Sequence, residues 1–318
     1  MAKRSPLNGK LVVLMGGSGF VGNYVAQALL QRGARLRIAS RSPEKAYTLK
    51  PLANLGQLQF ARCDALDQAS IARCVEGADA VVNLVGSFGG NLGRLMGTAP
   101  GWMAEAARQT GAGAFVHVSA ITGRVQGDDG EPIGYAAAKR LGEERVREHF
   151  PQVTVVRPSI IFGPDDSFIN LFAGLIRTFP VLPVFGPDAI IQPAYVDDVA
   201  DAIANALEEP GRFGDAIFEF GGPEKLSMLQ LNRMIADAQQ RRRTFIEMPD
   251  ALSALFAALP GTPMGQDQWE LLKSGNTVSG DFPGFAELGI VPRPIGLFLD
   301  RWMVRYRRHG RFAPRLSA

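Results

Sequence analysis

The chain has 318 residues, of which 46% are hydrophobic and 20% charged, with 36 glycines and 21 prolines. This composition supplies a sizeable core and excludes global disorder, and no apolar run reaches the roughly 18 residues that a membrane span needs. Cys63 and Cys74 are the only cysteines. Their spacing predicts neither a disulfide framework nor a metal site, and it favours a reducing cytoplasm. The short apolar run over 11–15 does not predict a signal peptide.

The net charge of +3 is unevenly distributed. Residues 301–318 contain six arginines and no acid, which leaves 28 basic against 31 acidic residues in positions 1–300. The main body is therefore slightly acidic. Because aromatic residues are not interleaved with basic ones, nucleic acid is not an expected partner.

Short apolar runs alternate with helical patterns along the first half of the chain. The expected strands are 11–15, 36–39, 57–61, 79–84, 114–118 and 153–156. The expected helices are 20–32, 68–75, 101–109 and 133–149. Strands that are apolar on both faces and separated by helices predict an α/β fold with a parallel, doubly wound Rossmann sheet.

After residue 157 the pattern becomes irregular and rich in proline. A strand is expected over 216–220 and helices over 198–207 and 228–239, the first of them capped by Asp197 and Asp198. We predict three parts, namely a nucleotide-binding domain over 1–157, a smaller C-terminal α/β lobe over 158–293 interleaved with the last sheet strands, and a basic amphipathic tail over 294–318.

The first expected strand runs directly into a glycine-rich turn and then a helix. The glycines follow the G-x-x-G-x-x-G spacing, which permits a tight turn, close approach of a pyrophosphate and close packing of the helix on the strand. The helix N-terminus would offer free N–H groups and its positive dipole end to phosphates. The predicted dinucleotide contacts are Gly16, Ser18, Gly19, Phe20, Val21 and Gly22. A glycine-rich turn without a ligand is the alternative.

The end of the second expected strand indicates which dinucleotide is bound. NAD-binding folds usually place a carboxylate there to hold the ribose 2′-hydroxyl. This chain has Ser40 and Arg41 instead. A guanidinium pairs with a 2′-phosphate and a hydroxyl donates to it, so NADP(H) is predicted over NAD(H). Alternatively, Arg41 is simply a solvated surface residue.

Further motifs, Asn83-Leu-Val-Gly86, Tyr135-x-x-x-Lys139 and Arg157-Pro158-Ser-Ile-Ile-Phe-Gly163, resemble those of an extended or atypical short-chain dehydrogenase/reductase of the NAD-dependent epimerase/dehydratase superfamily. The stretch 192–200 and the ending 304–312 resemble the NADPH-binding accessory subunits of respiratory complex I. The resemblance implies a tightly held, largely structural NADPH and partners among complex I subunits. It also implies coenzyme contacts from Asp64, Ala65, Leu84, Val85, Gly86, Ser119, Tyr135, Lys139, Pro158, Ile160 and Ile161.

Tyr135 and Lys139 are the candidate catalytic pair, because residues four apart share a helix face. In a working reductase the ammonium lowers the pKa of the phenol, which exchanges a proton as hydride moves. The resemblance places Ala120 where the carbonyl-polarising hydroxyl belongs, with Ser119 and Thr122 as the nearest substitutes. Losing one such donor costs about 10²–10³ in rate, so efficient catalysis is not expected. The alternatives are an NADP-dependent reductase, epimerase or dehydratase of a small carbonyl, sugar or quinone-like substrate, and a redox-sensing binding module.

In the tail, Phe298, Trp302 and Tyr306 recur at four-residue spacing beside a stripe of arginines. A basic amphipathic helix with aromatic residues suits an anionic membrane surface or an acidic protein, and residues Arg301–Arg315 are the candidate segment. The alternative is a terminal helix docked on its own domain. We expect a cytoplasmic protein, and under the first interpretation one that lies on the inner face of the cytoplasmic membrane.

Overall fold

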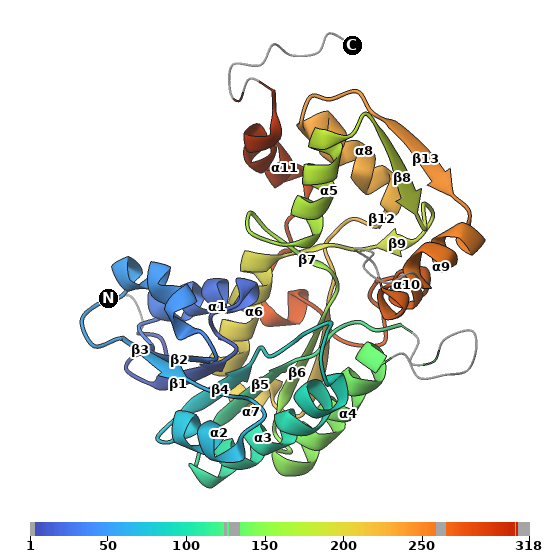
Figure 1. Cartoon of the computed structure of the whole chain (residues 1–318). Helices are drawn as coiled ribbons and strands as arrows, with labels where there is room; N and C mark the ends of the chain where they lie inside the picture. Colours follow the sequence, from blue (N-terminus) through green and yellow to red (C-terminus); the bar gives the residue numbers. More distant parts are fainter. Residues whose placement is uncertain (1–3, 124–125, 127–133, 259–264, 309, 311–318) are drawn as a thin grey trace.

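The computed structural model describes residues 4–123, 126, 134–258, 265–308 and 310, and a single large sheet organises it (Figure 1). Within the described residues, seven parallel strands follow the order β11-β6-β5-β4-β1-β2-β3. These strands are β1 (Leu11–Met15), β2 (Arg35–Ser40), β3 (Leu58–Arg62), β4 (Ala80–Asn83), β5 (Ala114–Val118), β6 (Thr154–Pro158) and β11 (Ala216–Phe220). The predicted doubly wound parallel sheet is confirmed.

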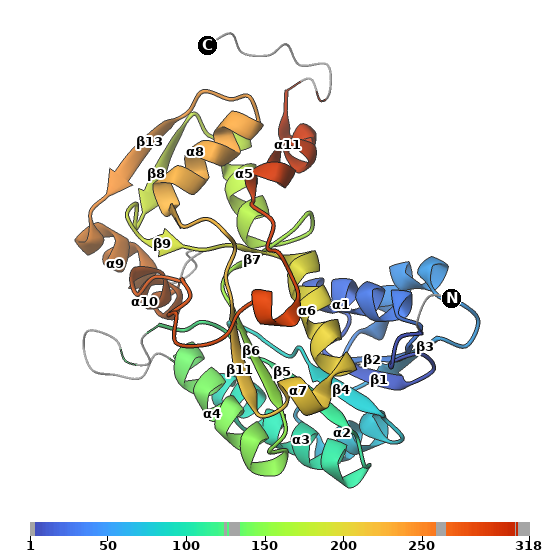
Figure 2. The same ribbon diagram turned by 180° about the vertical axis from the view of Figure 1, so that it is seen from behind.

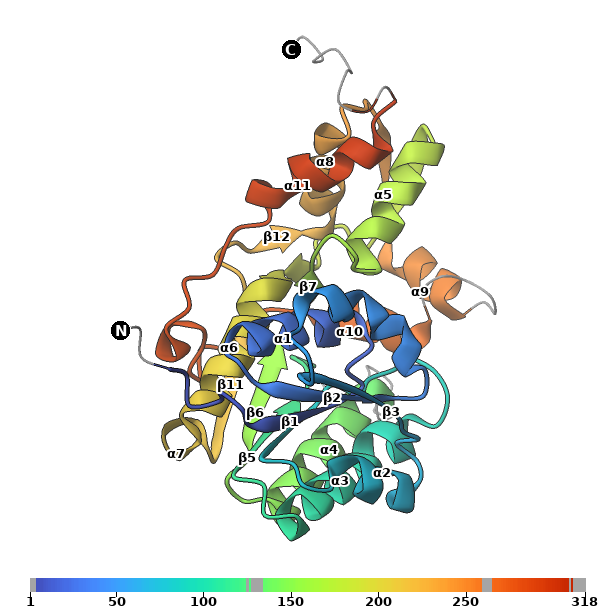
Figure 3. The same ribbon diagram turned by 90° about the vertical axis from the view of Figure 1, so that its left-hand side faces the viewer.

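Helices cover both faces of the sheet (Figure 3). One face carries α1 (Phe20–Gln31) and α6 (Val196–Glu208), and the other carries α2 (Gln68–Val75), α3 (Ala99–Gln109) and α4 (Gly134–His149). The central strand β1 is Leu-Val-Val-Leu-Met and is buried along its whole length. Alternate side chains of β1 enter the two hydrophobic cores, which is why its sequence is continuously apolar rather than alternating.

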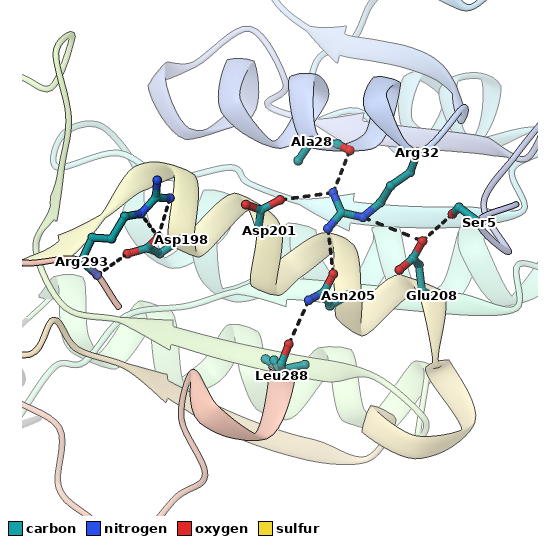
Figure 4. Close-up of polar contacts among 9 residues, drawn as sticks. All are labelled: Ser5, Ala28, Arg32, Asp198, Asp201, Asn205, Glu208, Leu288 and Arg293. Atoms are coloured by element: carbon teal, nitrogen blue, oxygen red, sulfur yellow. Dashed lines mark hydrogen bonds and ion pairs between the residues drawn. The ribbon is translucent and has the colours of Figure 1, made fainter. Parts of the chain in front are cut away.

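A half-buried polar network joins α1 to α6 (Figure 4). The guanidinium of Arg32 donates to Asn205 Oδ1 at 2.7 Å and to Asp201 Oδ1 at 3.2 Å. Asn205 Nδ2 in turn donates to the carbonyl oxygen of Leu288 at 2.9 Å. These contacts hold α6 against α1, although α6 lies in the proline-rich part of the chain after residue 157.

The smaller lobe lies beyond the carboxyl ends of the sheet strands (Figures 1 and 2). Within the described residues its strands pair as β7 with β10, β9 with β12, and β8 with β13. Their bounds are β7 (Ile161–Phe162), β8 (Val181–Phe185), β9 (Ile190–Ile191), β10 (Ala194–Tyr195), β12 (Leu226–Ser227) and β13 (Thr244–Met248). Its helices are α5 (Phe168–Thr178), α8 (Met228–Ala238), α9 (Asp250–Ala258), α10 (Gln266–Lys273) and α11 (Gly296–Met303).

Several short elements complete the described chain. They are α7 (Pro210–Phe213), the 3₁₀ segments η1 (Pro43–Leu52), η3 (Ala286–Leu288) and η4 (Val304–Tyr306), and the π-helical turn η2 (Gly93–Thr98). Neither η1 nor η2 was predicted from the sequence. The expected helix over 133–149 is α4, although residue 133 lies outside the described residues.

The prediction that Asp197 and Asp198 cap α6 is wrong. The helix begins at Val196, so both acids lie in its first turn, and Tyr195 precedes it without a side-chain cap. Asp198 is buried and accepts hydrogen bonds from the backbone N (2.8 Å) and Nε (2.6 Å) of Arg293 (Figure 4). An ion pair between distant segments therefore replaces the local cap.

The aromatic side of the tail is docked on the smaller lobe. The rings of Phe298 and Tyr195 stack with centroids 4.0 Å apart, and Trp302 lies 5.9 Å from Phe298. For these aromatic residues, the structure agrees with the alternative of a terminal helix docked on its own domain. Most of the predicted basic segment after residue 308 lies outside the described residues. Within the described part, no helix is both long and apolar enough to cross a bilayer.

Candidate functional site

The glycine turn is shaped by contacts that leave no room for side chains. Gly16 has φ +77°, and a Cβ on it would lie 3.1 Å from the backbone of Val85. A Cβ on Gly22 would lie 2.6 Å from the carbonyl oxygen of Gly17. The first glycine therefore allows the loops after β1 and β4 to meet, and the last allows α1 to pack against the turn.

The N-terminus of α1 has no internal partner for its first N–H groups. Gly19 is the N-cap residue, is exposed and provides no side-chain cap, and the first helical turn contains no acid. Phe20 and Val21 follow in the half-buried first turn. An uncapped, acid-free helix start is the electrostatic complement of a pyrophosphate, so this part of the site fits a dinucleotide.

Two unpaired guanidiniums flank Ser40 at the ends of β2 and β3. Ser18 Oγ donates to Ser40 Oγ at 2.8 Å, which ties the glycine turn to β2. Arg41 follows Ser40, and the strand register places Arg62 directly beside Ser40. Both arginines are exposed, and neither has an ion pair or a side-chain hydrogen bond within the described residues. The arrangement fits a 2′-phosphate. The sequence analysis missed Arg62, because only the pairing register brings it to Ser40.

The loops after β3 and β4 are held by their own polar side chains. Asp64 Oδ1 accepts from Leu66 N at 2.9 Å, which orders the turn that contains the half-buried Ala65. Asn83 Oδ1 accepts from Val85 N at 3.0 Å. Leu84 and Val85 are half-buried there, and Gly86 is exposed. These predicted contact residues therefore follow the carboxyl ends of β3 and β4, on the same edge of the sheet, with β1 and β2 between them.

His117 is buried, and one of its ring nitrogens has no hydrogen-bond partner within the described residues. Its Nδ1 lies 3.0 Å from Asn83 Nδ2, and burial lowers the pKa of the imidazole to about 3, so the ring is neutral. Nδ1 must then accept, and the proton resides on Nε2, which is buried without a partner in the described residues. Ser119 Oγ is likewise buried without a partner there. Two orphaned polar atoms thus lie on β5 and just beyond its end.

Tyr135 and Lys139 lie one turn apart on α4, and both are held by further contacts. Lys139 Nζ donates to the carbonyl oxygen of Val118 at 3.1 Å and lies 5.9 Å from the centroid of the Tyr135 ring. Phe88 stacks on that ring at 4.5 Å. Burial raises the pKa of Tyr135 to about 12 and lowers that of Lys139 to about 8, with Glu143 opposing the latter change. Burial is therefore the first cause of both pKa changes.

The segment that contains Ala120 connects the ends of β5 and β6. Backbone hydrogen bonds run from Ser119 to Val156 at 2.8 Å and from Ile121 to Pro158 at 3.0 Å. Ala120 is half-buried between these linked residues and offers no hydroxyl, while Thr122 is buried.

A residue of the smaller lobe closes this region. Asn276 Nδ2 donates to Ile121 O at 2.9 Å, and its Oδ1 accepts from Ile160 N at 2.6 Å. Ile160 and Ile161 are half-buried beside it. The sequence analysis missed Asn276, since no local pattern marks a residue that lies 116 positions beyond its partner.

The predicted coenzyme contacts gather along one edge of the sheet because parallel strands place their carboxyl ends together. This edge carries an uncapped helix start, two unpaired arginines and two orphaned polar atoms. All of these features fit an anionic dinucleotide. In a bound coenzyme of this class the nicotinamide ring supplies the hydride chemistry, and the protein supplies binding and orientation.

Comparison with known proteins gives consistent matches. A family model described as the NAD dependent epimerase/dehydratase family matches residues 12–219. The chain is 31% identical to NADH dehydrogenase (ubiquinone) 1 alpha subcomplex subunit 9, mitochondrial, of Mus musculus, over 96% of this chain and 83% of that protein. It is 30% identical to a ceramide reductase of Caulobacter vibrioides, over 63% of this chain and 62% of that protein.

A solved structure with the same fold is a dTDP-glucose 4,6-dehydratase from Streptomyces venezuelae with NAD and TYD bound. It superimposes with a TM-score of 0.72 and 19% identity, covering 93% of this chain and 96% of the dehydratase chain. At this identity the likeness concerns the fold.

Proposed function

Because the chain belongs to the NAD-dependent epimerase/dehydratase family, we propose that it is an NADP(H)-binding accessory or assembly subunit of NADH:ubiquinone oxidoreductase. The main support for the partner is the similarity to the murine complex I subunit, which extends over 96% of this chain. In this role the nucleotide mainly stabilises the fold. A coenzyme present at a thousand times its Kd would contribute about 4 kcal/mol to the free energy of unfolding.

The preference for NADP(H) over NAD(H) rests on charge. A 2′-phosphate beside Ser40 would lie between Arg41 and Arg62, neither of which has an ion pair within the described residues. Within the described residues, the side-chain hydrogen bonds of Ser40 are to Ser18 Oγ and the backbone N of Ser42, and neither involves a carboxylate. Pairing with phosphate would satisfy both guanidiniums and remove their mutual repulsion.

The single observation that carries the structural role is the set of contacts around Tyr135 and Lys139. A proton-transferring tyrosine needs a pKa nearer the working pH, whereas burial raises this one to about 12. Phe88 covers its ring, Lys139 is engaged by a backbone carbonyl, and Ala120 supplies no donor to a substrate carbonyl. With the coenzyme bound, Lys139 would hold the nicotinamide ribose without requiring turnover.

The second candidate is an enzyme, an NADP-dependent reductase, epimerase or dehydratase of a small carbonyl, sugar or quinone-like substrate. The observation that favours it is the retained Tyr135–Lys139 pair, and Ser119 Oγ is an available hydroxyl one residue from Ala120. Turnover of a candidate carbonyl that Tyr135→Phe abolishes, with NADPH affinity unchanged, would establish the enzyme.

The location follows from the proposed partner. We place the protein in the cytoplasm, peripheral on the inner face of the cytoplasmic membrane, where NADH:ubiquinone oxidoreductase would hold it. Residues Arg301–Arg315 are its proposed membrane-facing segment. The redox-sensing alternative would require that NADPH and NADP⁺ give different affinities for the same partner.

The experiment begins with protein purified without added nucleotide. Calorimetric titration with NADPH and NADH measures affinity, and an affinity tag on the chain tests recovery of NADH:ubiquinone oxidoreductase from solubilised membranes. We expect NADPH to bind more tightly, to raise the midpoint of thermal unfolding, and to remain unoxidised by carbonyl acceptors. Failure to bind either coenzyme would overturn the proposal, and failure to recover the complex would overturn its subunit role.

A further inference from the structure

Three segments that are distant in sequence, namely the end of α5, the chain between α8 and β13, and the chain after α11, meet at the end of the smaller lobe that is farthest from the sheet (Figures 1 and 2), and each of them carries arginines. Arg243 Nε donates to the carbonyl oxygen of Ile176 at 2.6 Å, and Arg241 Nη2 donates to that of Tyr306 at 3.0 Å. These bonds join the end of α5, the segment after α8 and η4. We call this surface the arginine pole, and its members are Arg177, Arg241, Arg242, Arg243, Arg305, Arg307 and Arg308.

Most of the charge at the arginine pole is not neutralised by carboxylates. Arg307 pairs with Asp300 at 3.1 Å. By contrast, no ion pair within the described residues involves the following members: Arg177, Arg241, Arg243, Arg305 and Arg308. Their hydrogen bonds go to neutral oxygens, as when Arg305 donates to Asn170 Oδ1. A neutral oxygen satisfies the donor but leaves the positive charge to attract an anionic partner.

The close approach of like charges is visible at Arg241. Desolvation lowers its pKa first, and Arg243, Arg177 and Arg308 lower it further. These residues come from all three segments. The convergence therefore belongs to the fold and goes beyond the basic run at the end of the sequence.

Exposed apolar side chains border the arginine pole. Phe179 is 51% exposed and Val181 47% exposed, both within four residues of Arg177. Ile246, on the paired strand β13, is 51% exposed. A cationic surface with protruding apolar residues matches the interface of an anionic bilayer, where charges meet headgroups and apolar side chains enter the acyl boundary. An acidic protein surface would also fit the arginines, and it would be favoured if the chain fails to bind anionic vesicles.

We propose that the arginine pole, with Phe179 and Val181 as its inserting side chains, docks this protein on an anionic phospholipid bilayer. This deepens the membrane-facing part of the proposed function and replaces the tail alone by a surface composed of three segments. The aromatic residues of α11 do not insert, because Phe298 stacks on Tyr195. Nucleotide binding takes place at the opposite end of the lobe and is not required for docking.

The test is co-flotation of the full chain with vesicles of phosphatidylcholine, alone or with about 30 mol% phosphatidylglycerol. We expect binding only to the anionic vesicles, and loss of most binding at about 0.5 M salt. The double substitution Arg177→Gln/Arg308→Gln removes two exposed charges without breaking an ion pair. At about 1 kcal/mol for each arginine near the surface, it should weaken binding about 30-fold.

The matched control is Arg73→Gln/Arg108→Gln, which changes the net charge equally on the exposed faces of α2 and α3. It should change vesicle binding less than about twofold if only the arginine pole faces the lipid. Phe179→Ser should remove the binding that persists in high salt.

Equal loss in the two double variants, or no binding of the wild-type chain to anionic vesicles, would overturn the proposal. An NADPH titration on each preparation separates this outcome from failure of the proposed function. All variants should bind NADPH as the wild type does. A wild-type chain that floats with vesicles but binds no coenzyme would refute the NADP(H) assignment and leave the arginine pole standing.

Discussion

Lys139→Met should stabilise the coenzyme-free protein at neutral pH. Lys139 is 4% exposed, and its ammonium has one hydrogen bond, to the carbonyl oxygen of Val118. Burial lowers its pKa from 10.5 to about 8, so holding the charged form inside the protein opposes folding. Methionine keeps most of the apolar side-chain volume and removes the charge. The substitution therefore separates the cost of the ammonium from the packing of its stem.

The magnitude follows from the pKa change. Each pKa unit corresponds to about 1.4 kcal/mol, so the buried ammonium costs about 3 kcal/mol at pH 7. Losing the hydrogen bond to Val118 costs about 1 kcal/mol. The substitution should therefore raise the free energy of unfolding by about 2 kcal/mol in total. The unfolded chain binds the extra proton between about pH 8 and pH 10.5, so wild-type stability rises with pH through this window. The advantage of Lys139→Met should therefore almost vanish at about pH 10.

Urea unfolding at pH 7 and at about pH 10 measures this difference directly. Lys45→Met, at an exposed lysine in η1, is the matched control and should show no comparable pH dependence. A stability difference for Lys139→Met that is independent of pH, or a loss of stability at pH 7, would refute the reasoning. With coenzyme present the variant should bind NADPH more weakly, because the proposed ribose contact is gone.

Three other substitutions test the site and its support. Arg41→Asp should weaken NADPH binding at least about 100-fold and leave NADH nearly unaffected, and an unchanged affinity ratio in calorimetry would contradict the NADP(H) assignment. Gly22→Ala places a Cβ 2.6 Å from a backbone oxygen and should cost about 1–3 kcal/mol in urea unfolding. Gly174→Ala, where the added carbon meets open space, should not lower the free energy of unfolding and serves as the control. Glu143→Gln leaves the buried Arg157 guanidinium without its bidentate carboxylate partner and should lower the free energy of unfolding by about 3 kcal/mol. A loss below about 1 kcal/mol would show instead that Glu219 compensates for the missing charge.

The sheet was predictable because each of its strands carries its own signal. Leu11–Met15 is continuously apolar, and Ala114–Val118 is apolar apart from the buried His117, so both strands can be recognised without knowing their partners. The glycine turn was predictable for the same reason, since the spacing of Gly16, Gly19 and Gly22 encodes its geometry locally. Local chemistry therefore sufficed for the fold class and for the phosphate end of the site.

The features that sequence analysis missed depend on contacts between distant positions. Aspartate is a common helix-capping residue, but Asp198 instead forms an ion pair with Arg293, which lies 95 residues away in sequence. Arg62 becomes a candidate phosphate ligand only through its register with Ser40. Asn276 bridges two loops from the other lobe. A single sequence contains no local pattern for any of these pairings, because tertiary packing decides them.

Several unfavourable features of this chain lie where we propose that the coenzyme binds. The buried Lys139 ammonium and the orphaned His117 Nε2 and Ser119 Oγ are polar groups whose burial is not fully compensated within the described residues. A chain selected for stability alone would replace such groups with apolar or paired ones. An anionic dinucleotide along the same edge would compensate the cations, and its ribose and amide groups would offer partners to neutral donors. We therefore attribute these local costs to ligand binding, and they explain why a coenzyme that undergoes no reaction would still determine whether the protein is stable.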